Sequence, residues 1–318
     1  MTLVIAILRT LTFSKLWALL RAYYAFVLGR VFGKNAKARP QAFVSIEPTN
    51  RCNLSCPECV SGSGELTRPR GHMSLANFKH IVDQIYRHTL VLNLYMQGEP
   101  YLNPQLPEMI AYAKRKKLFV SLSTNANILP PLSVESLPQH LIISADGATP
   151  EGYTSYRRGG DLNKVRAFVR AIAELKQKEK SGLPYVELQF LAHQHNAHER
   201  KATRALFKGQ YNRFVTKKMQ IIHEENRAHF QAQSVCCNRY IDQQRLQPSC
   251  FKMISTAVFT QDGYWVACCM DKQAQHRFGN VLEEDYRDVL QGTALRDFRQ
   301  SLITDKARIA ICRNCPYA

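Results

Sequence analysis

The sequence of 318 residues has no apolar run long enough to cross a membrane. Apolar residues concentrate in residues 1–39, but Arg9, Lys15, Arg21 and Arg30 interrupt them before they reach the roughly 18–20 residues that a spanning helix needs. The segment also has no clear cleavage site for a secretory signal peptide. It has no acidic residue, so it contributes strongly to the formal charge of +18.

Residues 1–39 are therefore predicted to form an apolar and basic helical segment. Two arrangements remain open: the helix lies on the inner membrane surface, or it packs on the main domain. The four interior charges do not share one face of a helical wheel, which weakens the membrane alternative. The excess positive charge favours anionic partners, such as phosphorylated metabolites and lipids. No dedicated RNA-binding motif is present, so nucleic acid is not an expected partner.

The ten cysteines are not spread evenly, and the chain has no internal repeat or low-complexity tract. They form clusters at positions 52/56/59, 236/237, 250, 268/269 and 312/315. Gaps of two or three residues are typical of metal sites in a reducing compartment rather than of a disulfide framework. We therefore expect a cytoplasmic protein, either free or at the inner face of the membrane.

From residue 42 onward, strand-like and helix-like segments alternate, which predicts a parallel sheet with right-handed crossovers. The expected fold is α/β, with a partial parallel (β/α)6 TIM-like barrel over residues 40–232. A smaller, cysteine-rich α+β domain over residues 233–318 is expected to include a hairpin that turns at Asp262-Gly263. The expected strands are Ala42–Ile46, Val91–Met96, Leu118–Leu122, His140–Ile143, Tyr185–Leu191 and Arg213–Met219.

The polar motifs lie just beyond the ends of these strands, and such ends converge on one mouth in a parallel barrel. The first is the loop that contains Cys52, Cys56 and Cys59, spaced C-x3-C-x2-C. Three thiolates reach around one metal centre, but a tetrahedral zinc or a four-iron cluster needs four ligands. Either a fourth residue completes the site, for example His72 or His80 on zinc, or one position stays open for chemistry.

This cysteine pattern resembles the signature of the radical S-adenosylmethionine (radical SAM) superfamily. Gly98-Glu99-Pro100 is similar to the GEP motif of that family, and Ser144-Ala145-Asp146-Gly147 to its fourth-strand motif. The resemblance implies a [4Fe–4S] cluster on Cys52, Cys56 and Cys59 with one iron open to SAM. Reductive cleavage of SAM then yields a 5′-deoxyadenosyl radical that abstracts a substrate hydrogen. Many members have an aromatic residue where this chain has Glu58.

The resemblance also implies the residues that bind SAM. Gly98, Glu99 and Pro100 would contact its methionine end. Asn125, Ser144 and Asp146 are candidates for its ribose and carboxylate side, and the guanidinium of Arg157 suits a carboxylate.

The C-terminal cysteines resemble the SPASM/twitch accessory domain of radical SAM enzymes. Because the chain stops at Ala318, the shorter twitch form with one auxiliary [4Fe–4S] cluster is expected. Its ligands would be Cys250, Cys268, Cys312 and Cys315, and four thiolates would close the shell for electron transfer. Cys269 could act as the ligand in place of the adjacent Cys268. The pair Cys236 and Cys237 has no assigned role.

The expected function is oxidation or dehydrogenation of a small, lipid-linked or nucleotide-linked metabolite, with the second electron passing to the auxiliary cluster. An external one-electron reductant, such as flavodoxin or ferredoxin, would supply the first cluster. One alternative is modification of a peptide or protein by the same chemistry, and another is a non-catalytic iron–sulfur protein that binds RNA or senses redox state. The assisting base is unknown, and the residues considered for it are Glu187, Gln189, His193, His195 and Lys217.

Overall fold

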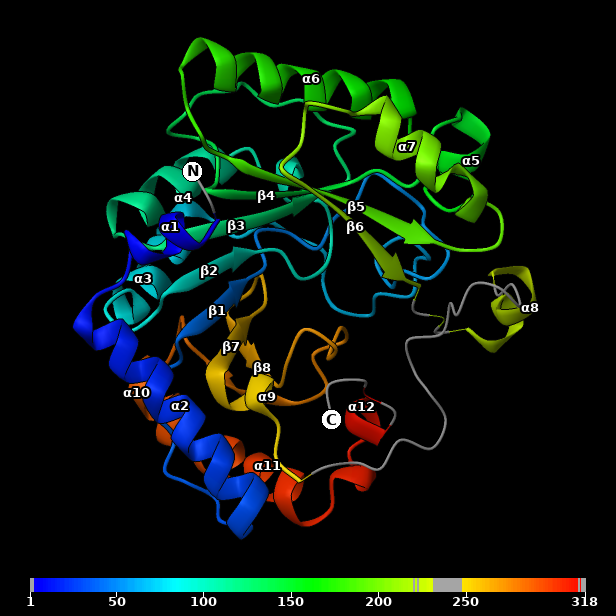
Figure 1. The fold of residues 1–318 in the computed structure, drawn as a ribbon. Coiled ribbons are helices and arrows are strands. Elements are labelled where there is room, and N and C mark those ends of the chain that lie inside the picture. The colour runs from blue at the N-terminus through cyan, green and yellow to red at the C-terminus, as the bar shows by residue number, and fades with distance from the viewer. Residues whose placement is uncertain (1–2, 220, 222, 231–247, 314, 316–318) are drawn as a thin grey trace.

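One mixed sheet runs through the computed structural model, which describes residues 3–219, 221, 223–230, 248–313 and 315. Its strand order is β6-β5-β4-β3-β2-β1-β7-β8-β9 (Figure 1). All neighbours from β6 to β7 pair in parallel, and β7-β8 and β8-β9 are antiparallel. The strands are β1 Phe43–Ile46, β2 Val91–Leu94, β3 Phe119–Thr124, β4 His140–Ser144, β5 Tyr185–Ala192, β6 Arg213–Lys218, β7 Thr256–Phe259, β8 Tyr264–Val266 and β9 Arg277–Asn280.

Helices cover the outer side of the curved sheet, and the apolar spacing of the sequence explains their packing (Figure 1). In α3, Phe78, Ile81 and Val82 are buried, and in α6 Val165 and Phe168 are. This confirms the α/β fold with a partial barrel. The helices are α1 Leu3–Leu8, α2 Phe13–Phe32, α3 Leu75–Ile85, α4 Leu106–Arg115, α5 Pro150–Thr154, α6 Leu162–Lys178, α7 Arg200–Leu206, α8 Arg227–Phe230, α9 Phe251–Ser255, α10 Tyr286–Gln291, α11 Thr293–Thr304 and α12 Ala310–Arg313.

Asn103 has the side chain of a helix cap and lies just before α4. The helix begins at Leu106, after a short 3-10 turn over Pro100–Leu102, and Asn103 Oδ1 accepts from the Gln105 amide at 2.9 Å, as a cap does. The Asn103 side-chain amide also donates to the carbonyls of Pro48 and Met73, at 2.8 and 2.9 Å. Tertiary contacts thus hold the same side chain that the local pattern assigns to a cap.

The predicted hairpin is present, with Gly263 at a φ of +88° in its turn. Its first strand, β7, also pairs in parallel with β1, and Ile46 lies opposite Phe259. The barrel sheet therefore continues into the cysteine-rich C-terminal region, a long-range pairing that local sequence patterns do not reveal.

The N-terminal segment forms α1 and α2, and α2 lies against α9 (Figure 1). The rings of Phe26 and Phe251 meet edge to face, with centroids 5.6 Å apart. One side of α2 therefore packs on the protein, mainly on the C-terminal region that holds α9. The expected contact with the main domain is made by Lys15, which donates to the Lys117 carbonyl at 2.6 Å. Within the described residues, no helix is long and apolar enough to cross a membrane.

Candidate functional site

The cysteine loop begins directly after β1, at the carboxyl ends of the parallel strands. Cys56 is buried, and Cys52 and Cys59 are half-buried. The loop closes on itself through the amide of Cys59, which donates to the carbonyl of Cys56 at 3.2 Å. It is tied to the segment after β4 because the amide of Ser55 donates to the carbonyl of Arg158 at 2.9 Å. The three cysteines therefore lie in one short, anchored turn.

Nitrogen donors surround two of the sulfur atoms. The amide of Leu54 lies 3.5 Å from Cys52 Sγ, and Asn125 Nδ2 lies 3.9 Å from the same atom. Arg157 Nη1 lies 3.9 Å from Cys56 Sγ. Hydrogen bonds to sulfur are one way in which a protein tunes a bound iron–sulfur cluster. Burial raises the pKa of Cys52 to about 11, so ligation of iron would displace its proton.

The Gly98-Glu99-Pro100 motif touches the backbone of the cysteine loop. Gly98 has a φ of +73°, and a β-carbon there would lie 2.6 Å from the carbonyl oxygens of Thr49 and Arg51. The amide of Glu99 donates to the carbonyl of Arg51 at 2.8 Å. Only glycine accommodates both the backbone angle and the close approach, so the motif fixes the end of β2 against the loop.

The Glu99 carboxylate joins the ends of β2 and β3. It accepts hydrogen bonds from Thr124 Oγ1 and the Asn125 amide, each at 2.7 Å, and from the Tyr101 amide at 3.3 Å. Burial raises its pKa to about 7 in spite of these donors. Pro100 begins the short 3-10 turn that follows.

Asp146 and Arg157 form a second bridge at the same mouth. Arg157 Nε donates to Asp146 Oδ2 at 2.5 Å, and the Leu191 amide donates to Asp146 Oδ1 at 2.6 Å. Arg157 thus connects Asp146 with Cys56, as described above. Asn125 reaches the cysteine loop from β3, donating to Asn53 Oδ1 at 2.9 Å.

Most residues expected around SAM are therefore linked to the cysteine loop by these contacts. Ser144, the last residue of β4, sits opposite Gln189 in the sheet. The expected partner of Arg157 was the carboxylate of SAM, and in this structure the guanidinium is engaged by Asp146.

Glu58, the departure from the family pattern, has a clear structural role that the sequence did not indicate. The side chain is buried, and its carboxylate accepts from Asn226 Nδ2 at 2.6 Å and from the His223 amide at 3.2 Å. It thereby holds the segment after β6 over the cysteine loop. The signal in the sequence was a charged residue at a position where the family resemblance implies an aromatic one.

An apolar cluster covers the cysteines beside Glu58. It combines residues of the cysteine loop and the segments after β4 and β6: Leu54, Cys56, Tyr156, Met219, Ile221 and Phe230. Such a cover keeps water from a reactive centre.

The residues considered as a base occupy different places. Gln189 donates to Glu187 at 2.8 Å, so these two bind each other. His193 is fully buried, and burial lowers its pKa to about 4, which keeps it neutral near pH 7. His195 lies beside it, with ring centroids 5.9 Å apart, and Lys217 is on β6.

The donor set of the loop suits a cluster better than a single zinc ion. Among the described residues, no three His, Cys, Asp or Glu side chains are placed to hold one metal ion. Each cysteine of a four-iron cluster binds a different iron, so its ligands stand farther apart. The histidines considered for zinc, His72 and His80, are both exposed.

The four cysteines expected at an auxiliary site come together between α9, β8 and α12. All four line one small cavity of about 30 Å³ with a largely apolar wall. Burial raises the pKa of Cys312 to about 12 and also raises the pKa of Cys268. Lys252 and Lys306 also line this cavity and place positive charge beside the thiols. The cysteines that line it are Cys250, Cys268, Cys312 and Cys315.

Cys269, considered as a substitute for Cys268, is not among the residues that line this cavity. Instead it lies close enough to Tyr95, after β2, to help raise the pKa of that phenol, which burial raises most. Cys236 and Cys237 lie outside the described residues.

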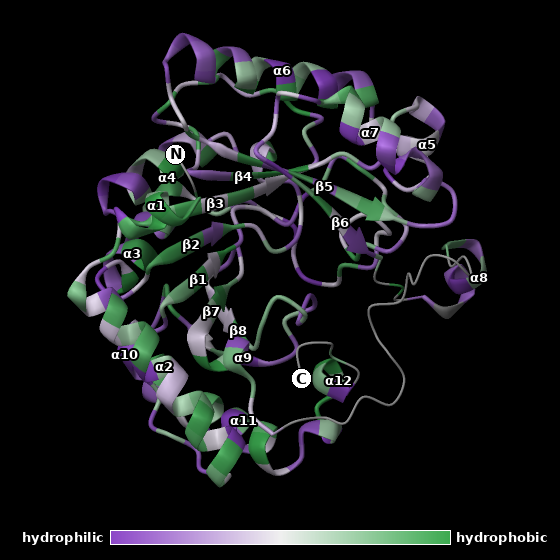
Figure 2. Ribbon diagram, viewed as in Figure 1, coloured by the Kyte–Doolittle hydropathy of each residue, from purple (hydrophilic) through white to green (hydrophobic). Residues whose placement is uncertain are grey.

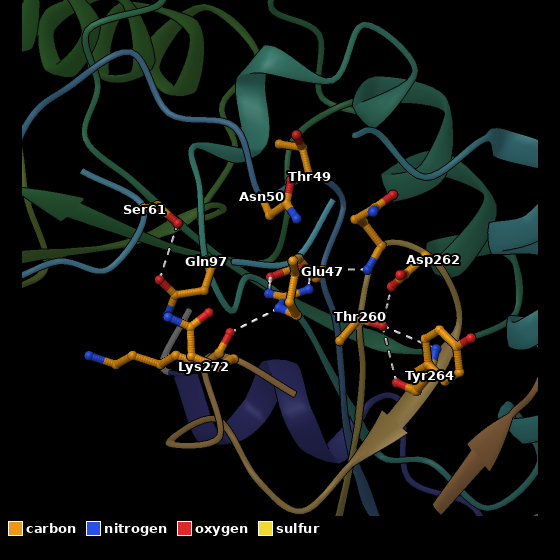
Figure 3. Close-up of polar contacts among 12 residues, drawn as sticks. Glu47, Thr49, Asn50, Ser61, Gln97, Thr260, Asp262, Tyr264 and Lys272 are labelled. Carbon is orange, nitrogen blue, oxygen red and sulfur yellow. Dashed lines mark hydrogen bonds and ion pairs between the residues drawn. The ribbon is translucent and has the colours of Figure 1, made fainter. Parts of the chain in front are cut away.

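A buried ion pair ties the start of the cysteine loop to the C-terminal hairpin (Figure 3). Arg68 donates from both terminal nitrogens to the Glu47 carboxylate, at 2.9 and 2.8 Å. The Gln261 amide donates to the same carboxylate at 3.0 Å, and Arg68 Nε donates to the Lys272 carbonyl at 2.9 Å. The cysteine loop and the cysteine-rich C-terminal region are thus directly connected.

Three cysteines follow the first strand of this fold, and four more lie before and after the C-terminal hairpin, a donor set that suits iron–sulfur clusters. Comparison with family models finds the radical SAM superfamily over residues 46–187 and the SPASM iron–sulfur cluster-binding domain over residues 250–316. The chain belongs to the radical SAM superfamily of enzymes and carries a C-terminal SPASM domain. The cofactors of this class are SAM, a [4Fe–4S] cluster and the auxiliary iron–sulfur clusters of the SPASM domain.

Two curated relatives share part of the sequence. The chain is 30% identical to an AdoMet-dependent heme synthase of Methanosarcina barkeri over 146 residues. These residues cover 45% of this chain and 40% of the relative. The chain is 31% identical over 166 residues to a PqqA peptide cyclase of Xanthomonas campestris, 50% of this chain and 41% of the relative. The chain thus spans about two fifths of the length of these relatives.

Solved structures show the same fold at low sequence identity. Streptococcus suis SuiB bound to S-adenosylmethionine gives a TM-score of 0.61 at 13% identity, covering 82% of this chain and 68% of SuiB. BtrN in complex with AdoMet and 2-DOIA gives a TM-score of 0.53 at 16% identity, covering 87% of this chain and 94% of BtrN.

Proposed function

We propose that this chain modifies a peptide or protein substrate by radical SAM chemistry, with Cys52, Cys56 and Cys59 as the ligands of the SAM-binding cluster. When bound, the reduced cluster and SAM supply a 5′-deoxyadenosyl radical that removes one hydrogen atom from the substrate. The observation that carries this proposal is the convergence of three strand-end segments on the cysteine loop through Gly98, Glu99 and Asp146–Arg157 contacts.

The surrounding residues would position SAM and exclude water. The side chains of Glu99 and Asn125 and the Asp146–Arg157 pair line the loops that the SAM carboxylate, amino group and ribose would reach. The bond from Arg157 to Cys56 Sγ would place positive charge next to the cluster. Gly98 and Pro100 shape the backbone there, and Ser144 completes the set at the end of β4.

The relatives favour a peptide over the small metabolite expected from the sequence. The Xanthomonas relative is named for a peptide, and SuiB, whose structure has also been solved with a precursor peptide, has the higher TM-score of the two structures above. Oxidation of a small molecule remains the second candidate. The structure of BtrN contains 2-DOIA together with AdoMet, and this chain covers 94% of the length of BtrN.

The chemistry is tested by release of 5′-deoxyadenosine. Reconstituted, reduced protein mixed with SAM should release it, and Cys56→Ala should stop the release. The control Cys269→Ala, outside both cysteine sets, should retain it. Wild-type protein with a full iron load that releases none with flavodoxin, ferredoxin or a chemical reductant would instead support a non-catalytic iron–sulfur protein.

The substrate class is tested by stimulation of that release. Fractions of a host extract are assayed before and after protease digestion. A stimulating activity destroyed by protease supports a peptide or protein substrate. A protease-resistant activity that passes a small-molecule filter supports the metabolite alternative.

We also propose that residues 1–39, 40–232 and 233–318 are the functional units and that Cys250, Cys268, Cys312 and Cys315 bind one auxiliary [4Fe–4S] cluster. The variant lacking Cys52, Cys56 and Cys59 should then retain about four iron atoms. About eight would show that further cysteines bind a third cluster, and none would refute the auxiliary site.

A further inference from the structure

Large apolar side chains are exposed almost entirely at the N-terminus. In the described part of the chain, twelve large hydrophobic side chains are exposed, and eleven of them lie between Val4 and Phe32; the other is Leu129. Figure 2 shows hydrophobic residues along α2 at the periphery of the molecule. A contiguous apolar surface of this kind marks a contact with another molecule or a membrane.

The fully buried positions of α2 are small or charged: Ala18, Ala22, Gly29 and Lys15. The contact is close, because a β-carbon on Gly29 would lie 2.8 Å from Ser249 Oγ. Phe26 and a few other large side chains of α2 are half-buried. The large exposed side chains form what we call the outer face of α2, which consists of Phe13, Leu16, Trp17, Leu20, Tyr23, Tyr24, Val31 and Phe32.

Basic residues border this outer face. At 3.6 residues per turn, Arg21 and Arg30 lie roughly a quarter turn to either side of its centre. The Arg21 guanidinium lies 4.9 Å from the ring centre of Trp17. The remaining charge within α2, Lys15, points inward and donates to the carbonyls of Thr10 and Lys117, at 3.0 and 2.6 Å. The scatter of charges on the helical wheel therefore does not disrupt the outer face.

A groove of about 630 Å³ continues the same surface. Aromatic and aliphatic side chains of α2 form one wall, and the segment after the helix supplies further cations. No acidic residue precedes Glu47, so every charge that residues 1–46 contribute to this surface is positive. Its lining includes Trp17, Leu20, Tyr24, Arg21, Lys37 and Arg39.

We propose that α1 and α2 dock the protein on an anionic membrane surface, with the outer face of α2 at the boundary between lipid headgroups and acyl chains. Aromatic rings with a polar edge favour that boundary, and arginine stems lie along apolar surface while their heads reach phosphate. A second copy of the chain fits less well, because it would bring two surfaces of the same charge together.

The proposal is tested with vesicle sedimentation of the full-length, reconstituted protein. Vesicles of phosphatidylcholine with one third phosphatidylglycerol should bind it, and pure phosphatidylcholine should bind it far less. At about fivefold in affinity for each basic residue, the triple variant Arg21→Gln/Lys37→Gln/Arg39→Gln should bind roughly a hundredfold more weakly. The matched control, Lys164→Gln/Arg166→Gln/Arg170→Gln on exposed positions of α6, should bind like the wild type.

The apolar contribution has its own variant and readout. Leu20→Ser/Tyr24→Ser should lose binding, and Leu129→Ser should not. Of the two tryptophans, Trp265 is only 1% exposed, so a blue shift of fluorescence on adding vesicles reports Trp17 and should vanish in Trp17→Phe.

Release of 5′-deoxyadenosine without vesicles should be the same in all these variants, which separates loss of docking from loss of fold. Equal binding to both vesicle types, or unchanged binding by both the charge and the apolar variants, would overturn the proposal. A concentration-dependent dimer that Leu20→Ser/Tyr24→Ser dissociates, without vesicle binding, would assign this face to a second copy instead.

Discussion

The buried ion pair of Glu47 and Arg68 allows a quantitative test of how the cysteine loop is held. The two side chains are 0% and 2% exposed. Arg68→Met keeps the unbranched stem of the side chain without the guanidinium, and it leaves the carboxylate with the Gln261 amide as a donor. Removing one partner of a buried pair costs roughly 3–5 kcal/mol, because the remaining charge is uncompensated. That is a large part of the usual 5–15 kcal/mol of a folded domain.

The measurement is urea unfolding of the iron-loaded protein without oxygen, followed by the fluorescence of buried Trp265 in a Trp17→Phe background. The midpoint should fall in Arg68→Met. Arg70→Met is the matched control, since Arg70 is exposed two positions away and its loss should change stability by about 0.5 kcal/mol or less.

The double variant Glu47→Leu/Arg68→Met separates the pair from its surroundings. It removes both charges, leaving only the Gln261 amide and the Lys272 carbonyl without these partners. We expect it to be more stable than Arg68→Met alone, with a coupling between the two sites of about 2 kcal/mol or more. Additive losses, or a loss below about 1 kcal/mol in Arg68→Met, would refute the reasoning.

Three further predictions concern single positions. Gly98→Ala should abolish binding of labelled SAM in equilibrium dialysis. The control Gly209→Ala has a φ of +82° and no atom within 4 Å of its β-carbon, so it should lower the free energy of unfolding by only the roughly 1–2 kcal/mol of backbone strain. Burial lowers the pKa of Lys15 from 10.5 to about 8, so between these pH values the unfolded chain binds more protons and stability should rise with pH. Lys15→Met should lack this rise in urea unfolding, and an equal rise in the variant would contradict the assignment. Glu58→Leu should lose its iron to a chelator roughly tenfold faster, because a charged hydrogen bond contributes about 1.5–3 kcal/mol; an unchanged rate would mean that the covering segment does not depend on Glu58.

The sequence predicted the parts of the fold that local patterns determine. Apolar positions such as Phe78 and Ile81 recur at helical spacing, and they are buried in the structure. The C-x3-C-x2-C spacing of the first three cysteines, together with the resemblance of Gly98-Glu99-Pro100 to the GEP motif, indicated the family. The close approach of Gly98 to the backbone of the cysteine loop was found only in the structure.

Other features depend on residues that meet only after folding. Asn103 accepts from the Gln105 amide before α4 as a cap does, but its side-chain amide also binds two carbonyls of the loop between β1 and α3. Lys15 is one of the four charges that interrupt the N-terminal apolar segment, yet it is buried and donates to carbonyls of the turn after α1 and of the segment before β3. The pairing of β7 with β1 joins residues about 200 positions apart, as Val44 and Ala257 show.

That pairing also fixes how the two cysteine sites relate. The cysteine loop follows the end of β1, opposite the end of β7, whereas Cys250 and Cys268 lie near the start of β7 because β8 runs back along it. At about 3.3 Å per residue, the length of β7 separates the two sites by roughly 10 Å or more. An auxiliary cluster would therefore act at a distance from SAM, through electron transfer or by contacting a different part of the substrate. An extended peptide covers such a span with about three or four residues, so the spacing is compatible with the proposed substrate class and predicts that shorter peptides lose stimulation.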